Sequence, residues 1–147
     1  MTYQEIARAQ IAEDEGFRDK VYPCTEGFPT VGYGHRLSEW HARVHPVGTR
    51  LPVPVLKKWF DMDLETADKD ARAFAGSAWE GMSDARRAVL VNMAFNIGGA
   101  RLAKFTRFRA AVVKGHWPKA AREMLDSKWA QQVGDRAKRL ADKMRDG

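Results

Sequence analysis

Three residues near the N-terminus are of types, and at spacings, that could hydrolyse a bond. Glu15 is followed nine positions later by Cys24, the only cysteine, and Thr30 comes six positions after that. The sequence predicts a helix end at Glu15 and a tight β-hairpin after it. A partly desolvated carboxyl has a raised pKa and keeps a proton available at neutral pH, so Glu15 is the candidate general acid.

Each of these residues has a simpler explanation when taken alone. A single glutamate is usually a surface residue, a single cysteine is often a small buried side chain, and threonine is ordinary in strands. His35, which closes the segment Gly32-Tyr33-Gly34-His35, is more typical of a structural hydrogen-bonding residue than of a catalyst. The spacing of His, Cys, Asp and Glu matches no zinc pattern, so we expect no metal ion and no cofactor.

Local signals predict the elements that must position this segment. Thr2 and Glu5 fit a capping box at the start of a helix over about residues 3–14, and Gly16 fits the position after its last turn. The expected apolar face of this helix consists of Ile6, Ala9, Ile11 and Ala12. Strand formers and glycines then indicate two or three short antiparallel strands within residues 17–37, followed by a short helix from Ser38.

A long amphipathic helix is predicted from Pro54, because apolar residues recur there at steps of three and four. Gly76 ends it, and the proline-rich segment before it, residues 44–54, reads as a loop. Residues 88–97 are apolar on nearly all sides, which is typical of a helix in the middle of a bundle. Ser83 is its expected cap. Three more helices are expected, over 106–114, 118–125 and 135–144, the last capped by Asp135.

These elements predict one α+β domain over residues 1–147. A small β-hairpin lobe would span about 16–54, a linking helix about 54–75, and a helical lobe about 76–147 together with the N-terminal helix. One cysteine excludes an internal disulfide. The first residues lack a signal-peptide pattern, and no apolar run approaches the roughly 20 residues of a membrane helix.

The hairpin segment resembles the active site of the phage-type lysozymes, the endolysins of the T-even phage lysozyme family (glycoside hydrolase family 24). That pattern is Glu-x8-Asp-x5-Thr, with Cys in place of Asp in some members. The matching residues are Glu15-Gly16, Arg18, Tyr22, Cys24, Gly27, Thr30 and Gly32-Tyr33-Gly34-His35. Residues 84–98 resemble the central helix of the family and 117–147 its C-terminal end, whereas about 39–54 match poorly. The resemblance implies a lysozyme-like fold.

The resemblance also implies hydrolysis of the β-1,4 bond between N-acetylmuramic acid and N-acetylglucosamine in peptidoglycan. Glu15 would protonate the leaving oxygen, while Cys24 and Thr30 take the places that hold water on the other face of the sugar. A thiol has a pKa near 8.5, so three roles stay open for Cys24. It could activate water as a thiolate, attack the sugar directly and form a covalent adduct, or remain a neutral spacer while Thr30 positions the water.

Further site residues follow from the same resemblance. Tyr22, Phe95 and Asn96 are expected to contact the glycan, and Arg136 matches the arginine that pairs with the catalytic glutamate. His35 and Asp63 match an ion pair that joins the hairpin to the long helix, although a plain surface pair would contribute only about 0–1 kcal/mol. Arg36 stands where the family has an apolar residue, so that edge of the groove would differ.

Charge and context complete the expectations. The net charge of +6 favours polyanionic partners, or reflects only a solvated basic surface. Basic residues of the C-terminal third could contact anionic outer membrane or could belong to a solvated, helix-packed face; they are Arg122, Lys128, Arg136, Lys138, Arg139, Lys143 and Arg145. We expect a monomer without nucleic acid that waits in the host cytoplasm until a membrane lesion releases it. The rival functions are a lytic transglycosylase and a non-enzymatic module that binds nucleic acid.

Overall fold

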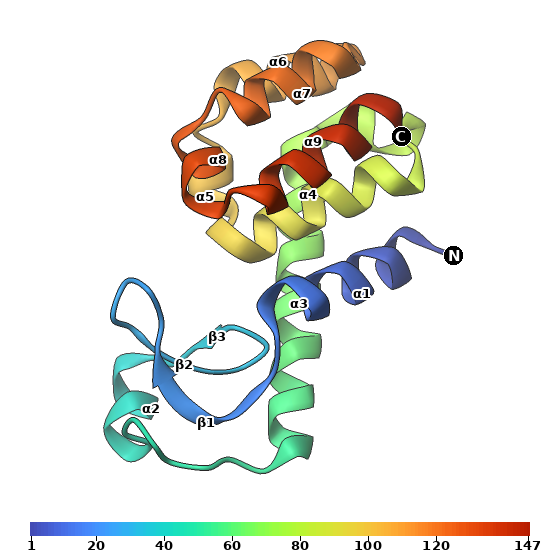
Figure 1. The fold of residues 1–147 in the computed structure, drawn as a ribbon. Helices are drawn as coiled ribbons and strands as arrows, with labels where there is room; N and C mark the ends of the chain where they lie inside the picture. The colour runs from blue at the N-terminus through green and yellow to red at the C-terminus, as the bar shows by residue number, and fades with distance from the viewer. The chain divides into compact units, whose positions relative to one another are not determined.

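The computed structural model describes residues 1–147, which form helices, one small antiparallel sheet and the turns and segments that connect them (Figure 1). The chain forms two compact units, one of residues Ala9–Glu65 and one of Met1–Arg8 with Thr66–Gly147. Two helices, α1 (Tyr3–Glu15) and α3 (Val53–Ala75), contribute residues to both units. The predicted α+β class is therefore confirmed. No helix combines the length and the apolar character that crossing a membrane requires.

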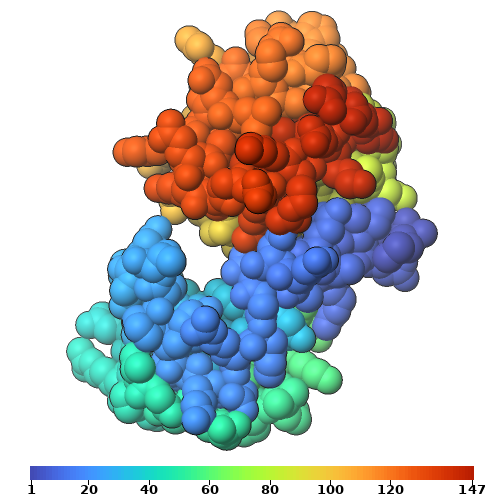
Figure 2. Space-filling view, in the orientation of Figure 1, coloured from blue at the N-terminus to red at the C-terminus, as the bar shows by residue number.

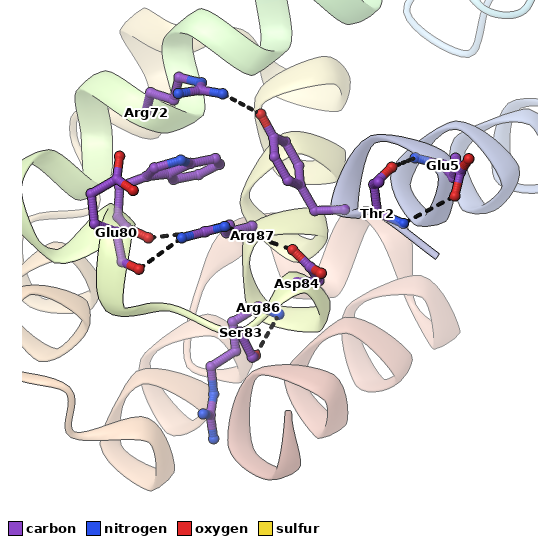
Figure 3. Close-up of polar contacts among 10 residues, drawn as sticks. Thr2, Glu5, Arg72, Glu80, Ser83, Asp84, Arg86 and Arg87 are labelled. Carbon is purple, nitrogen blue, oxygen red and sulfur yellow. Dashed lines mark hydrogen bonds and ion pairs between the residues drawn. The ribbon is translucent and has the colours of Figure 1, made fainter.

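Helix α1 begins with the predicted capping box. The amide of Thr2 donates to Glu5 Oε2 at 3.0 Å, and the amide of Glu5 donates to Thr2 Oγ1 at 3.2 Å (Figure 3). The predicted apolar face was right only at Ile11: the buried positions are Tyr3, Ala7 and Ile11, whereas Ala9 is exposed and Ile6 and Ala12 are half-buried. Three residues at steps of four form one stripe, and its first member is an aromatic residue that the prediction left out.

The unit of residues 9–65 is built on a sheet with strand order β1 (Arg18–Pro23), β2 (Pro29–Gly32) and β3 (His35–Arg36). Its apolar core consists of Val21, Val31, Leu37, Leu51 and Leu56. Helix α2 (Glu39–Val44) follows, and its predicted start is confirmed, because Ser38 Oγ accepts from the amide of His41. The turn between β1 and β2, residues 24–28, lies at the surface (Figure 2).

The proline-rich segment after α2 pairs with the sheet, which a simple loop prediction did not include. The Val21 amide donates to Thr49 O at 2.9 Å, and the Leu51 amide donates to Asp19 O at 2.9 Å. An isolated antiparallel bridge joins Lys20 and Arg50. This segment therefore satisfies backbone groups on the otherwise free edge of β1, as buried or shielded strand edges require.

The helical unit continues the chain from the C-terminal part of α3. It comprises a 3-10 helix η1 (Gly76–Gly81), α4 (Asp84–Ile97), α5 (Gly99–Leu102), α6 (Thr106–Lys114), α7 (Trp117–Leu125), α8 (Lys128–Val133) and α9 (Asp135–Asp146). The central helix α4 is buried from Ala88 to Ala94, as its apolar sequence predicted. Ser83 caps it by accepting from the amide of Arg86 at 3.2 Å (Figure 3).

The short elements η1, α5 and α8 were not predicted, and one predicted cap was wrong. Gly134 occupies the cap position of α9 and makes no side-chain cap, while Asp135 is the first helical residue. A carboxylate there still interacts favourably with the helix dipole. Helix α8 does have a side-chain cap, because Ser127 Oγ accepts from the Ala130 amide at 3.1 Å.

An arginine–aromatic cluster holds the first turn of α1 within the helical unit. The rings of Tyr3 and Trp79 meet edge to face with centroids 5.2 Å apart, and Arg72 donates to the Tyr3 hydroxyl at 2.5 Å. Arg87 donates to the carbonyls of Trp79 and Glu80 at 2.9 and 2.8 Å (Figure 3). Burial raises the pKa of Tyr3, so the phenol stays a neutral hydrogen-bonding group at physiological pH.

Candidate active site

The hairpin turn brings Cys24 and Thr30 to the same end of the sheet. Strand register pairs Tyr22 with Thr30 and Pro23 with Pro29, so the turn contains only residues 24–28. The amide of Cys24 donates to Phe28 O at 2.9 Å, and the amide of Gly27 donates to Cys24 O at 2.8 Å. The two hydrogen bonds close a tight loop, and they fix the Cys24 backbone beside the strand that carries the threonine.

The side chains of Cys24 and Thr30 form one hydrogen-bonded pair. Thr30 is buried, at 4% exposure, and its hydroxyl donates to Phe28 O at 2.8 Å. A hydroxyl has one proton and two lone pairs, so while it bonds Phe28 O it can accept from a neutral thiol or from water, and its proton can turn instead to a Cys24 thiolate. Cys24 is half-buried and its side chain interacts with that hydroxyl. The pair can therefore present a sulfur and an oxygen to one bound water molecule.

The environment of Cys24 favours its thiolate. Burial raises the pKa of the thiol, but hydrogen bonds to the backbone at Glu26 and Phe28 and to the Thr30 hydroxyl lower it, and the net pKa lies below the ordinary value. Backbone amides stabilise an anion because their dipoles point toward it. The carboxylate of Glu26 opposes this effect by raising the same pKa. The turn thus acts as a small backbone cradle for a negative charge.

The carboxyl group of Glu15 lies directly over the turn between β2 and β3. Glu15 is the last residue of α1, and the chain leaves the helix through Gly16, whose φ is +68°. A Cβ atom placed on Gly34 would lie 3.0 Å from Glu15 Cδ and 3.4 Å from Cγ, and closer still to Oε2. Gly34 also has φ +70°, a region that side chains rarely adopt. Only glycine fits both constraints.

Tyr22 connects Glu15 electrostatically with Cys24. Burial raises the pKa of the Tyr22 phenol, the charge of Arg18 lowers it, and the charges of Glu15 and Cys24 raise it further. The Arg18 guanidinium lies 4.2 Å from the centroid of the Tyr22 ring. The phenol therefore lies within the electric field of both candidate catalytic groups, as a residue at the edge of a substrate site would.

The predicted contact between His35 and Asp63 is present. His35 Nδ1 lies 2.7 Å from Asp63 Oδ2, with the two side chains 22% and 34% exposed. The imidazole also stacks on Trp59, with centroids 4.6 Å apart and planes inclined by 27°. The hydrogen bond and the stacking together join β3 to α3 within the unit of residues 9–65. This unit therefore contains Glu15, Tyr22, Cys24, Thr30, His35 and Asp63.

The other predicted site residues belong to the helical unit. Arg136 donates to Oδ1 of the fully buried Asn92 through Nε at 3.0 Å and Nη2 at 2.8 Å. Asn96 Oδ1 accepts from Trp129 Nε1 at 2.7 Å, and Phe95 is half-buried near the end of α4. The hydrogen bond orients the amide of Asn96, because its oxygen is occupied and its NH₂ group remains as a donor.

Sequence reasoning missed several groups that build this site. The amides and the carbonyl of the 24–28 turn carry no residue signature, because any amino acid supplies them. Asn92 could have been found, since it is a polar residue in the middle of the otherwise apolar run of residues 88–95. Its burial at 0% exposure requires hydrogen-bond partners, and Arg136 provides them. No group of three or more His, Cys, Asp or Glu side chains is arranged to hold a metal ion.

Comparison with known proteins identifies the family. Residues 12–145 match the profile of the family described as phage lysozyme. The chain belongs to the phage lysozyme family. It is 31% identical over 148 residues to the pre-baseplate central spike protein Gp5 of Enterobacteria phage T4, an alignment that covers 88% of this chain and 26% of the spike protein. It therefore spans about a quarter of the length of that relative.

Two relatives from Dictyostelium discoideum match over most of their own length. Probable T4-type lysozyme 1 is 25% identical over 146 residues, and probable T4-type lysozyme 2 is 23% identical over 146 residues. Both alignments cover 86% of this chain and 86% of the relative. The resemblance that the hairpin segment carries is thus confirmed at the level of the family.

The contact between Glu15 and Gly34 predicts the effect of adding a methyl group at position 34. Gly34→Ala should displace the carboxyl group and lower kcat on the order of 10²-fold, because small misplacements of a reacting group have costs of that size. Gly115→Ala is the matched control: its φ is also +70°, but the new Cβ would make only an ordinary 3.9 Å contact. Both variants should lose roughly 1–2 kcal/mol of stability from left-handed backbone strain. Equal activities of the two folded variants would contradict the collision with Glu15.

The hydrogen bond from Thr30 predicts a change in the titration of Cys24. Thr30→Val keeps the shape but removes the hydroxyl that lowers the pKa of the thiol, so the thiolate should form at higher pH. The rate of iodoacetamide alkylation against pH, followed by intact-protein mass spectrometry, measures this midpoint. Thr25→Val, an identical change at an exposed position of the same turn, should leave the midpoint where it is in the wild type. A midpoint unmoved by Thr30→Val would show that the hydroxyl does not stabilise the thiolate.

Proposed function

We propose that this chain hydrolyses the β-1,4 bond between N-acetylmuramic acid and N-acetylglucosamine in peptidoglycan. The observation that carries the proposal is that one small unit of a phage lysozyme family member contains both a carboxyl group held against Gly34 and a cysteine–threonine pair. Glu15 is the general acid of the proposed reaction. Its position at a helix end, against Gly34, holds the carboxyl group in one place.

In the proposed step, Cys24 and Thr30 hold and activate the attacking water. The oxygen of water bonds to the anomeric carbon while the bond to the leaving oxygen breaks. The proton of Glu15 moves to the leaving oxygen, and a proton of the water moves to the Cys24 thiolate. The lowered pKa of the thiol supports this assignment, because it makes the base available closer to neutral pH. Attack by water opposite the leaving group inverts the anomeric configuration.

Product analysis with Glu15→Gln tests the proposed function. Purified peptidoglycan digested by the wild type should gain reducing N-acetylmuramic acid ends, and the variant should produce fewer by a factor of 10² or more, since it keeps the shape but supplies no proton. Mass spectrometry of the fragments separates the rival reaction. Anhydro-muramyl ends, which are lighter by one water, would make the enzyme a lytic transglycosylase. If Glu15→Gln released reducing ends as fast as the wild type, Glu15 would not be the general acid.

The biological role that follows is lysis of a bacterial host by a phage or prophage enzyme. The proposed enzyme collects in the host cytoplasm as a monomer and reaches the wall through a membrane lesion. The spike relative raises a second role for the same activity, as part of a virion. Proteomic analysis of purified particles against the cleared lysate separates the two, because a lytic enzyme would be found free and a spike component would remain with the particles.

Contact with anionic outer membrane is proposed in a limited form. In α9 the apolar residues Ala137, Leu140, Ala141 and Met144 are already buried in the helical unit. The helix cannot insert them into lipid without leaving its packing, so contact must come from the exposed cations alone. Vesicles containing phosphatidylglycerol should therefore bind the full chain at low salt and release it at about 0.5 M salt, where charges are strongly screened. Absence of binding at low salt would exclude the contact.

A further inference from the structure

A groove beside the hairpin has no role in the reaction described above. Its volume is about 470 Å³, within the range of small-ligand sites. It is lined by Phe28 and Pro29 of the hairpin, by Arg36 of β3 with Leu37, and by Glu39, Ala42 and Arg43 of α2. We call it the Arg36 groove. All of these residues belong to the unit of residues 9–65.

Arg36 supplies a positive charge that no acidic side chain neutralises. Its guanidinium stacks on the Phe28 ring, 3.2 Å from the centroid, and it takes part in no ion pair. Stacking uses the flat face of the guanidinium and leaves the N–H groups at its edge as donors. A stacked arginine is held in place before a ligand arrives, so less side-chain entropy is lost on binding. Such a group is suited to hold a carboxylate through two hydrogen bonds.

The second arginine of the groove is paired only weakly. Arg43 Nη2 lies 3.4 Å from Glu39 Oε1, and the two side chains are 76% and 88% exposed. Exposed pairs of this kind contribute little to stability, so a ligand can separate them. The groove then offers two guanidinium groups and one carboxylate. This mixed pattern complements a ligand that carries carboxylates together with an amino group.

The groove is adjacent to the candidate catalytic pair. Strand register places Arg36 directly opposite Thr30, and Pro29 precedes Thr30 in the chain. Phe28, whose ring carries Arg36, accepts from both the Thr30 hydroxyl and the Cys24 amide through its carbonyl oxygen. A group bound to Arg36 would therefore lie one strand away from the proposed water-holding residues. That is within reach of a substituent on a sugar bound there.

We propose that the Arg36 groove binds a carboxylate of the stem peptide attached to the muramyl sugar, and that Arg36 determines specificity for peptide-bearing substrate. The proposal rests on the proposed function. The peptide is favoured over the sugar's own lactyl carboxylate because the groove is larger than one carboxyl group. A single carboxylate would also leave its second arginine and Glu39 without a contact to the ligand, whereas stem peptides carry several carboxylates and an amino group.

Calorimetric binding to the Glu15→Gln protein, which prevents turnover, tests the groove. The probe is the soluble disaccharide N-acetylglucosaminyl-N-acetylmuramic acid with its tetrapeptide. Arg36→Gln should weaken binding about tenfold, the scale of one charge-assisted hydrogen bond pair. Arg36→Lys should recover part of the loss, because it restores the positive charge but not the paired N–H donors of the guanidinium. The control Arg50→Gln, an exposed arginine of the same unit that pairs with Asp19, should bind within twofold of the parent.

Two further probes identify the source of the carboxylate. The same disaccharide without peptide retains a free lactyl carboxylate, and the tetramer of N-acetylglucosamine has none. Arg36→Gln should change the affinity of neither probe. An equal loss for the peptide-free disaccharide would overturn the assignment to the peptide, and equal losses for Arg36→Gln and Arg50→Gln would overturn the groove as a site. Failure of wild-type protein to release reducing ends would instead remove the proposed function, because these binding measurements do not depend on turnover.

Discussion

The contact between the Glu15 carboxyl group and the backbone of Gly34 is the constraint on which the proposed site depends. A helix end is normally a poor place to fix a carboxyl group, because its backbone frays and its side chain is solvated. Here the carboxyl group meets Gly34, a turn residue without a side chain, and that turn is anchored by β2 and β3. The left-handed φ of Gly34 and the closeness of Glu15 are two demands on one position. The pairing of β2 and β3 therefore fixes the turn against which the Glu15 carboxyl group lies.

In the turn at residues 24–28, too, one residue meets more than one demand. Phe28 uses its carbonyl oxygen for the Thr30 hydroxyl and the Cys24 amide, while its backbone also helps to lower the pKa of the Cys24 thiol. A carboxylate would need no such help to be ionised at neutral pH, but a thiol does, because its ordinary pKa lies above 8. A cysteine in place of the family's aspartate can thus act as a base only if the turn around it stabilises the thiolate. Burial works against that effect, but the backbone and Thr30 hydrogen bonds together lower the net pKa of the thiol.

The parts of this molecule that sequence could predict are those with a repeating or side-chain-encoded signal. The capping box at Thr2 and Glu5 and the buried run of α4 have such signals, and both are present. The apolar face of α1 was misjudged because an amphipathic aromatic residue, Tyr3, packs as core through its ring while its hydroxyl is satisfied by Arg72. The cap at Gly134 and the pairing of residues 49–51 with β1 depend on backbone geometry, which the side-chain types in the sequence do not predict.

Arg36 shows why a family resemblance does not extend to every position of a site. The pattern has an apolar residue after the histidine, which would cover the hairpin edge with hydrocarbon. In this chain a guanidinium covers the same edge by stacking on Phe28 and keeps its charge at the surface. An arginine can replace an apolar residue there because its flat face packs while its edge stays solvated. The hairpin thus keeps its packing, and the neighbourhood of Thr30 gains an anion-binding group without disturbing the turn that holds Cys24.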